Sequence, residues 1–503
     1  MLIVGSDLGA PTTVDIVCVI DIYMKQARLP WAMGSLDGNA AETTSWRLKS
    51  HSAWQDDPQW KSCVSRLSKF SGKLKVIELC GGVGTAFIAL SLLLPSACVE
   101  LAGHWDTDSD LAAYLNRVHP TSSVIHLGGI AGDIKQWSID DIAFGHIIVA
   151  GPPCPPWSKL GVRKSFEDVR ASVFWRVIDI VMHQAKHGFL GMFILENVEG
   201  IAHKSSGASE PPSTIIMKEL REGLTDRWEV GMHLLNALSF GLPQSRSRAF
   251  IVGHRIDLFG NGVELPVNFE RTVPLHHFLD VHDTHQVESN TGMQDKNITD
   301  WKQFYESRIT DTTCKGSFAV FDVSRTPSNR TSWNARGNVD MVECLTASGP
   351  NLHIMSLGDG DSRDLTIDRR IRGHERARLQ GFPPSICDMV SDNTASKRIF
   401  GNAMAVPVIG SMLASEIIAL CDHSKPSYLA EWLCAGDGMP EARDTPEQHA
   451  IAISGMAASF GSGSRPVSDI LPIPPLSKRR CVRQADSHTL VYYSDCYSVS
   501  YGL

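Results

Sequence analysis

Long apolar runs and a secretory leader are both missing from this sequence. No stretch comes near the ~18 uninterrupted apolar residues that a membrane-spanning helix needs. The segment from Met1 to Met24 has no basic n-region, and Asp7, Asp15 and Asp21 interrupt its apolar residues. We therefore expect neither a membrane span nor a secretory signal.

Metal-binding cysteine spacings and a basic excess are missing as well. The twelve cysteines are scattered without a CxxC pair or a Cys/His cluster at zinc spacing. This pattern predicts no structural metal and reduced thiols in an intracellular compartment. Lys and Arg total 47 against 55 Asp and Glu, a net charge of −8, which excludes a surface coated with basic residues. Binding to nucleic acid remains open, because it needs only a local basic stripe.

The clearest local pattern is a strand, a glycine turn and a helix between residues 74 and 93. Residues 74–79 predict a short strand and residues 86–93 an apolar helix. Between them, Cys80-Gly81-Gly82-Val83-Gly84-Thr85 is a turn whose small residues let backbone N–H groups approach a ligand. The turn lacks the third glycine of the dinucleotide fingerprint, so it suits a cofactor with an adenosine but no pyrophosphate.

Acidic and aromatic residues follow the next two expected strands. Residues 98–103 lead to His104, Trp105 and Asp106, and residues 124–127 lead to Asp133 and Ile134. Carboxylates and rings at successive strand ends are what a ribose and an adenine require. A purely structural reading, with Asp as a helix cap and Trp as a core residue, stays open.

A cysteine lies on a proline-rich loop, Gly151-Pro152-Pro153-Cys154-Pro155-Pro156-Trp157-Ser158, directly after the apolar run 146–150. The prolines exclude a helix and stiffen the backbone, so Cys154 is expected at the carboxyl end of a buried strand, where α/β sheets bind ligands. Taken alone, such a loop more often holds an incidental buried cysteine than a nucleophile.

Two further segments offer charged groups to the same region. Glu196 follows the apolar run 191–195, so it is expected to be half buried, either as a proton-handling acid or as a cap. In a strand, Gln244, Arg246 and Arg248 would share one face. Two guanidinium groups on one face indicate either a solvated edge strand or a clamp for an anion or a base.

The later segments depart from the alternation of strands and helices. Residues 254–336 are polar and loop-rich, which indicates a smaller domain, and residues 341–346 predict a strand that returns to the main sheet. Residues 372–383 predict a short basic helix ended by Gly and Pro, and residues 397–420 lead into a buried helix. Residues 454–477 are rich in Gly, Ser and Pro and predict a flexible tail.

Taken together, these segments resemble the cytosine-5 DNA methyltransferase family over roughly residues 73–421. Six short motifs occur in the family's order, with a variable stretch in the family's place before the fifth. They are Glu78 to Gly84, Pro153-Cys154, Glu196-Asn197-Val198, Gln244-Ser245-Arg246-Ser247-Arg248, Glu375 to Pro383, and Gly401-Asn402-Ala403.

The resemblance implies an α/β fold with a Rossmann-like S-adenosylmethionine-dependent methyltransferase domain and a smaller, loop-rich target recognition domain. The expected division is an N-terminal extension at 1–72, a catalytic domain at 73–255 and 340–421, a target recognition domain at 256–339 and a C-terminal tail at 422–503. The implied partner is double-stranded DNA, without metal or membrane, and the protein is expected to be a monomer. Its compartment would be the nucleus in a eukaryote and otherwise the cytoplasm.

The resemblance also assigns roles to individual residues. Cys154 would add to C6 of a flipped-out cytosine, Glu196 would bond N3 and the exocyclic amine, Arg246 would hold O2, and Arg248 would steady the loop or a phosphate. The residues expected to bind S-adenosylmethionine are Glu78, Cys80, Gly82, Gly84, Trp105, Asp106, Asp133, Ile134, Pro153 and Asn402.

Four positions depart from the family pattern. The family usually has Phe at Cys80, Glu at His104, Gln at Pro155 and Arg at His374. Two related functions compete with DNA methylation: a tRNA cytosine-5 methyltransferase of the same fold and a catalytically weak DNA-binding relative. The tRNA branch carries a Cys-Phe-Thr signature after the Glu-Asn-Val motif, and none occurs here. A nicotinamide oxidoreductase would explain the glycine turn and nothing else.

Overall fold

The computed structural model describes residues 52–434 except for short gaps. The gaps are 119–127, 155–156, 158–167, 205–207, 265, 281–291, 308–317, 328–337, 348–350, 358–366, 388–389 and 391–393. Several sequence-based predictions therefore lie outside the described residues. They concern the expected strand at 124–127, Pro155, the expected tail at 454–477 and the first 51 residues.

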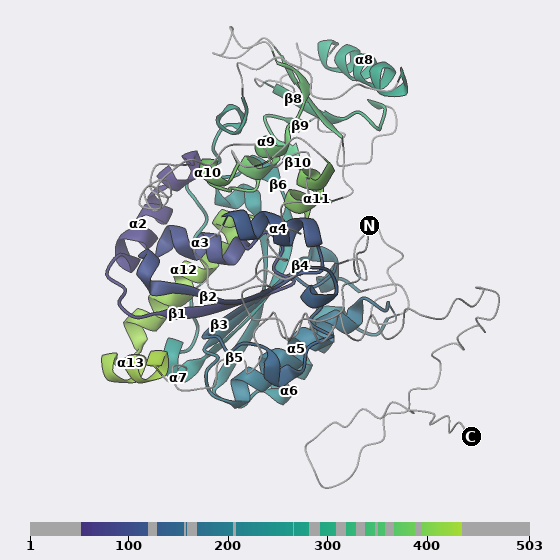
Figure 1. Cartoon of the computed structure of the whole chain (residues 1–503). Helices are drawn as coiled ribbons and strands as arrows, with labels where there is room; N and C mark the ends of the chain where they lie inside the picture. The colour runs from purple at the N-terminus through teal and green to yellow at the C-terminus, as the bar shows by residue number, and fades with distance from the viewer. Residues whose placement is uncertain are drawn as a thin grey trace, which may run out of the picture. The chain divides into compact units, whose positions relative to one another are not determined.

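A six-stranded sheet in the order β2-β1-β3-β4-β7-β5 forms the centre of the protein (Figure 1). The strands β2, β1, β3 and β4 are parallel, while β7 is antiparallel to both β4 and β5. Near-continuous apolar sequence in β1, β3 and β4 fits strands that are buried on both faces. The bounds are β1 Leu74–Leu79, β2 Val99–Trp105, β3 Ile147–Ala150, β4 Met192–Val198, β5 Trp228–Asn236 and β7 Ser247–Arg255.

Two hydrophobic clusters cover the two faces of this sheet, because successive strand residues point to opposite sides. One cluster takes Val76, Ile147 and Ile194 with helices α2 (Pro58–Leu67), α3 (Thr85–Leu93) and α12 (Val406–His423). The other takes Ile77 and Phe193 with α5 (Ala171–Lys186) and α6 (Pro212–Gly223). The N-terminal residues 53–67 belong to the first cluster through Trp54 and Trp60, which are 0% and 2% exposed.

A second, antiparallel sheet in the order β12-β11-β8-β9 has its own small core. Helix α8 (Gly292–Glu306) packs Ile298, Trp301 and Tyr305 against Phe321 and Met355 of this sheet. The strands are β8 Phe318–Asp322, β9 Asn338–Val339, β11 Leu352–Ser356 and β12 Asp368–Arg370. The strands β11 and β12 lie beyond residue 339, where the target recognition domain was expected to end.

The expected strand at 341–346 does not return to the main sheet. Only β10 (Val342–Glu343) forms there, and it pairs in parallel with β6 (Gln244–Ser245) in a separate two-stranded sheet. Further short helices are α4 (Ser109–Val118), α7 (Ile256–Phe259), α9 (Gly373–Leu379), α10 (Pro384–Cys387) and α13 (Pro426–Cys434). Helix α11 (Thr394–Asn402) precedes α12 and lines the smaller cavity described below.

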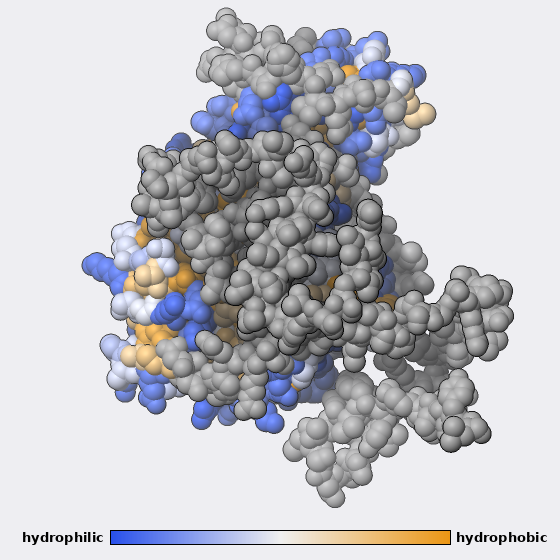
Figure 2. Space-filling model, viewed as in Figure 1, coloured by the Kyte–Doolittle hydropathy of each residue, from blue (hydrophilic) through white to orange (hydrophobic). Residues whose placement is uncertain are grey.

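One helical stretch, Ala395–His423, is long and apolar enough to cross a membrane by length and composition alone. Of its apolar 18-residue window, 78% is buried inside the protein, and a core helix passes the same test. On the face drawn in Figure 2, hydrophobic residues are visible among hydrophilic ones on the side that carries α2, α3 and α12.

Candidate active site

The register of the parallel strands brings the ends of β1 to β4 to one edge. Leu79 lies opposite both Trp105 and Ala150, and Ala150 lies opposite Leu195. The residues that follow these positions are therefore neighbours in space. They are the glycine turn after β1, Asp106 after β2, the Cys154 loop after β3 and Glu196 near the carboxyl end of strand β4.

Glu196 and Arg248 form an ion pair at this edge. Arg248 Nε lies 3.0 Å from Glu196 Oε1, and the two side chains are only 14% and 11% exposed. The antiparallel pairing of β4 with β7 places them together, because Val198 lies opposite Arg248. A carboxylate and a guanidinium held side by side can accept from and donate to one planar, polar ligand.

The loop that carries Cys154 is fixed by its neighbours as well as by its prolines. Asn197 Nδ2 donates to the Pro152 carbonyl oxygen at 3.1 Å, and Trp157 N donates to the Cys154 carbonyl oxygen at 3.0 Å. A Cβ atom at Gly200 would lie 2.1 Å from the Trp157 carbonyl oxygen, so only glycine fits there. Asn197, 2% exposed, thus positions the loop, a role that its place in the Glu-Asn-Val motif did not reveal.

Burial raises the pKa of the Cys154 thiol, and the Glu196 carboxylate adds to this effect. The guanidinium groups of Arg248 and Arg246 oppose it without reversing it. The thiol is neutral near pH 7, and its proton has to leave when the sulfur reacts.

Arg246 has a different environment from the one expected. Its Nη1 donates to the Leu345 carbonyl oxygen at 2.6 Å and its Nη2 to the Ala403 carbonyl oxygen at 2.7 Å, and the residue is 2% exposed. Arg246 N donates back to the Gln244 carbonyl oxygen at 3.1 Å, which interrupts the strand between β6 and β7. The two-residue alternation fails across this break, so Arg248, rather than Arg246, lies against Glu196.

Cys344 is a residue of this site that the sequence did not indicate. Its Sγ lies 3.5 Å from Arg246 Nη1 and 3.6 Å from Arg248 Nη2. Its sequence context, a short apolar run, predicted only a strand. Nothing in that run signals a cysteine beside two arginines.

The glycine turn after β1 has the left-handed backbone that brings N–H groups to a ligand. The φ angles are +49° at Cys80, +56° at Gly82 and +73° at Gly84. Gly82 N donates to Asp106 Oδ2 at 3.0 Å, and His104 Nε2 lies 3.0 Å from the Gly82 carbonyl oxygen. A side chain at Gly82 would meet nothing within 4 Å, so the turn faces open space.

A cavity of about 420 Å³ opens beside this turn. Three of the residues predicted to bind a cofactor line it: Gly82, Asp106 and Asn402. The other lining residues are Thr107, Asp108, Ser109, Asp110, Leu111, Arg398 and Ile399. Arg398 reaches from α11 to Asp108 and Asp110, each at 2.8 Å.

The remaining predicted cofactor residues lie behind or beside this cavity. Glu78 is buried, and its Oε1 accepts from Phe87 N at 2.5 Å in the first turn of α3. Trp105 packs edge-to-face on Trp137 with ring centroids 5.7 Å apart, in the same cluster as Ile134. The others are Cys80 and Gly84 in the turn, Asp133, which caps Lys135 N, and Pro153 in the cysteine loop. Burial raises the pKa of Cys80, and the charges of Asp106 and Asp133 add to it.

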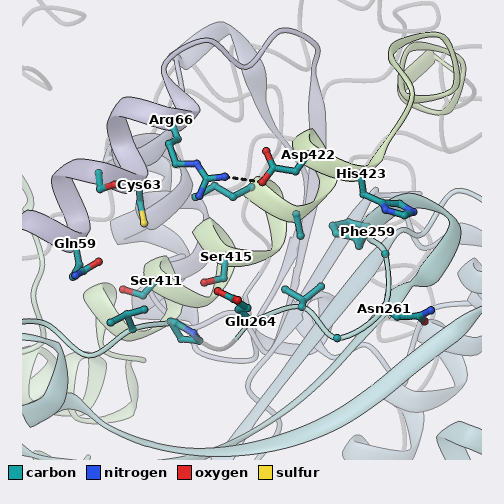
Figure 3. A pocket seen from close by; sticks show the side chains of 18 of the residues that line it. Gln59, Cys63, Arg66, Phe259, Asn261, Glu264, Ser411, Ser415, Asp422 and His423 are labelled. Carbon is teal, nitrogen blue, oxygen red and sulfur yellow. Dashed lines mark hydrogen bonds and ion pairs between the residues drawn. The ribbon is translucent and has the colours of Figure 1, made fainter.

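A larger cavity of about 640 Å³ lies elsewhere, between α2, α12 and the chain after α7 (Figure 3). Arg66 and Asp422 form an ion pair of 2.6 Å across it. None of the predicted site residues lines this cavity. The smaller cavity, which is lined by Gly82 of the glycine turn and by Asp106 and Asn402, is therefore the candidate cofactor site.

One further cluster, Asp280, His374 and Glu375, has side chains close enough together to hold a metal ion. Their charges are already engaged by arginines, since Glu375 binds Arg369 and Asp280 binds Arg378. We therefore interpret it as an ion-pair network.

Comparison with known proteins identifies the family. The profile described as "C-5 cytosine-specific DNA methylase" matches residues 74–418, which include every strand of the main sheet and the cysteine loop. The chain belongs to this family.

Curated relatives in the family include bacterial Type II methyltransferases. M.HpaII of Haemophilus parainfluenzae is 30% identical over 285 residues, covering 52% of this chain and 69% of the relative. M.SsoII of Shigella sonnei is 27% identical over 358 residues, covering 70% and 82%. Among solved structures, the S. pombe Dnmt2 methyltransferase aligns with a TM-score of 0.42 and 17% identity, over 68% of this chain and 97% of that one.

Proposed function

We propose that the protein is a DNA (cytosine-5-)-methyltransferase that takes its methyl group from S-adenosylmethionine. The observation that carries the proposal is the placement of the Cys154 loop between the Glu196–Arg248 pair and the glycine turn, since a Cβ atom at Gly151 would lie 3.9 Å from Glu196 Oε2 and 3.4 Å from the Cys80 carbonyl oxygen. The Type II methyltransferases among its relatives support DNA as the substrate.

The residues around the cavity fit S-adenosylmethionine. The space at Gly82 is open, and the Asp106 carboxylate lies beside it. The buried Trp105 Nε1 has no hydrogen-bond partner among the described residues. Gly82, Asp106 and Asn402 would hold the cofactor, which supplies an electrophilic methyl group when bound.

In this mechanism Cys154 is the nucleophile. Its sulfur gives up its proton to solvent and forms a bond to C6 of the target cytosine, and the pair of electrons displaced from the C5–C6 bond makes C5 nucleophilic. After C5 gains the methyl group, the C5 proton leaves, the S–C6 bond breaks and the aromatic ring is restored. The target base has to leave the duplex for this reaction, at a cost of a few kcal/mol.

Glu196 and Arg248 stabilise the ring while charge develops on it. Glu196 would accept from the exocyclic amine and share a proton with N3 as charge develops on the ring, and Arg248, which already binds Glu196, would donate to the base oxygen. Arg246 would act indirectly, because its donors hold the main chain at Leu345 and Ala403. This division of roles reverses the one expected from sequence.

A covalent trap tests the proposal. The protein is incubated with S-adenosylmethionine and a duplex containing 5-fluorocytosine, then run on a denaturing gel. Fluorine at C5 blocks the final elimination, so we expect a shifted band that is lost in Cys154→Ala and kept in Cys63→Ala, whose cysteine lies on α2.

A tRNA carrying 5-fluorocytidine is run in parallel. A band with tRNA and none with DNA would replace the proposed substrate with tRNA. No band with either, together with no cofactor binding by calorimetry, would favour a DNA-binding relative without activity.

A further inference from the structure

Among the described residues, the site holds a buried arginine and a largely buried one, Arg246 and Arg248, and one carboxylate bound to them. Arg248 binds Glu196, whereas Arg246 donates to main-chain carbonyl oxygens and to a sulfur. Burying two like charges is costly unless each is compensated. The repulsion is visible in Arg246: burial lowers its pKa, and the charge of Arg248 adds to this.

The sulfur of Cys344 lies between the two guanidinium groups. It is 3.5 Å from Arg246 Nη1 and 3.6 Å from Arg248 Nη2, both within the range of N–H···S hydrogen bonds. Within the part of the chain that the structure describes, a neutral thiol here has the Leu345 carbonyl oxygen as its acceptor, at 3.6 Å. That oxygen already accepts from Arg246 at 2.6 Å. The surroundings therefore favour a sulfur that accepts two hydrogen bonds.

The electrostatics point the same way. Burial acts to raise the pKa of Cys344, but the charges of Arg246 and Arg248 and their hydrogen bonds outweigh it, and the net pKa is lowered. Cys154 differs in this respect, because burial and Glu196 raise its pKa. The two cysteines of the site thus have opposite shifts.

We propose that Cys344 is a positioning residue for methyl transfer, whose sulfur holds the Arg248 guanidinium in place for Glu196 and the target base. Arg248 then has three fixed contacts: Nε on Glu196, Nη1 on the Ser247 carbonyl oxygen at 2.8 Å, and Nη2 on the sulfur. The inference rests on the proposed function, because it assigns Arg248 to the base.

Kinetics of substituted proteins test this role. Cys344→Ala removes the sulfur that accepts from the two guanidinium groups, and Cys344→Ser replaces it with a hydroxyl that reaches less far from Cβ, so we expect kcat to fall roughly tenfold to a hundredfold while the KM for S-adenosylmethionine is unchanged. Cys344→Asp should recover much of the rate. A carboxylate oxygen extends further from Cβ than sulfur does, which matches the shorter N–H···O distance. Cys63→Ala is the matched control and should keep the wild-type rate.

A thiol titration provides a readout that does not need activity. Thiolate absorbance is followed against pH in Cys154→Ser and in Cys154→Ser with Cys344→Ser. The groups that face Cys344 are Arg246 and Arg248, with Glu196 and Cys154 acting on those arginines. We expect the two titrations to differ by one thiolate, which forms at a pH below the ordinary range of cysteine pKa values. The Cys63→Ser substitution should instead remove a thiolate that forms at a pH above that range.

The outcomes separate this inference from the proposed function. If the wild-type protein methylates nothing but the low titration is found, the function fails while the Cys344–arginine contact stands. If Cys344→Ala and Cys344→Ser match the wild-type kcat, or if Asp is no better than Ala, the positioning role is wrong even though the enzyme is active. Should Cys344→Ala fail to fold, the comparison of Ser with Asp still decides.

Discussion

Cys154 has surroundings that favour its neutral form, although its proposed task requires a thiolate. Burial and the Glu196 carboxylate raise its pKa, and Arg248 and Arg246 only partly offset them. This balance protects the thiol from reaction before a substrate is bound. A base that hydrogen-bonds Glu196 would weaken the repulsion between carboxylate and sulfur, so substrate binding and activation of Cys154 are coupled through Glu196.

The coupling predicts a shift in the reactivity of Cys154 when Glu196 is neutralised. In Glu196→Gln the carboxylate no longer raises the pKa of Cys154, so its thiolate should form at lower pH. We expect the midpoint of iodoacetamide labelling against pH, read on the Cys154 peptide by mass spectrometry, to move down. Glu199→Gln, a more exposed carboxylate three residues further on, should leave it unchanged. A midpoint that stays or rises in Glu196→Gln would contradict this account.

At the scale of elements, the junction of β1 and α3 is stabilised by a buried acid. Glu78 Oε1 accepts from Phe87 N in the first turn of α3, where backbone N–H groups have no partner within the helix. Burial raises the pKa of Glu78 to about 8, although the amides of Phe87 and Ala86 act in the opposite direction. The carboxyl group is therefore largely protonated at pH 7, and in this neutral form it accepts the hydrogen bond from Phe87 N.

This pKa predicts how stability depends on pH. The pKa of Glu78 in the folded chain is above its ordinary value of 4.5. Between pH 4.5 and 8 the folded chain therefore binds more protons than the unfolded chain does. The contribution of Glu78 to the free energy of unfolding is complete below pH 4.5 and is lost as the pH rises to 8. The loss is at most roughly 5 kcal/mol. Glu78→Gln keeps an acceptor for Phe87 N but does not titrate, so its unfolding free energy should depend less on pH in this window.

Urea unfolding at several pH values measures this difference. Glu100→Gln, on the neighbouring strand and paired with Lys73 at 2.6 Å, is the control and should retain the wild-type slope. A slope that is the same in Glu78→Gln and in the wild-type protein would show that Glu78 does not titrate in this range.

Local sequence predicted the elements whose signal is local. The strand, turn and helix between residues 74 and 93 are found as β1 and α3, because their apolar spacing and glycines fix them without distant partners. Pairing partners of short strands are not encoded in this way. Residues 342–343 pair with β6 instead of the main sheet, and the strand break at Arg246 redirects its side chain to Leu345 and Ala403. The environment of Cys344 depends on both of these long-range contacts, so sequence alone could not reveal it.

At the scale of the whole molecule, a buried ion pair connects the small sheet to the catalytic half. Arg369 of β12 and Glu375 of α9 are both 0% exposed and lie 2.6 Å apart between Arg369 Nη2 and Glu375 Oε1. The Glu375 carboxylate also accepts from the backbone N–H groups of Asp280 and Arg372, each at 2.8 Å. One carboxylate thus connects β12, the start of α9 and the chain before α8.

Neutralising this carboxylate should be far more costly than neutralising an exposed one. In Glu375→Gln the side-chain NH2 group, which only donates, faces the N–H groups of Arg369 and of the backbone, which also only donate. The charge of Arg369 also loses its counter-ion. We expect a loss of about 3–5 kcal/mol in the free energy of unfolding. Glu222→Gln, which breaks an exposed pair with Lys218, should change it by less than ~1 kcal/mol.

Guanidinium unfolding followed by tryptophan fluorescence measures both losses of stability, since Trp301 is in the small core and Trp54 and Trp60 are in the large one. If the pair connects the two cores, Glu375→Gln should also separate their transitions, whereas a single transition at the wild-type midpoint would show that the connection does not depend on Glu375.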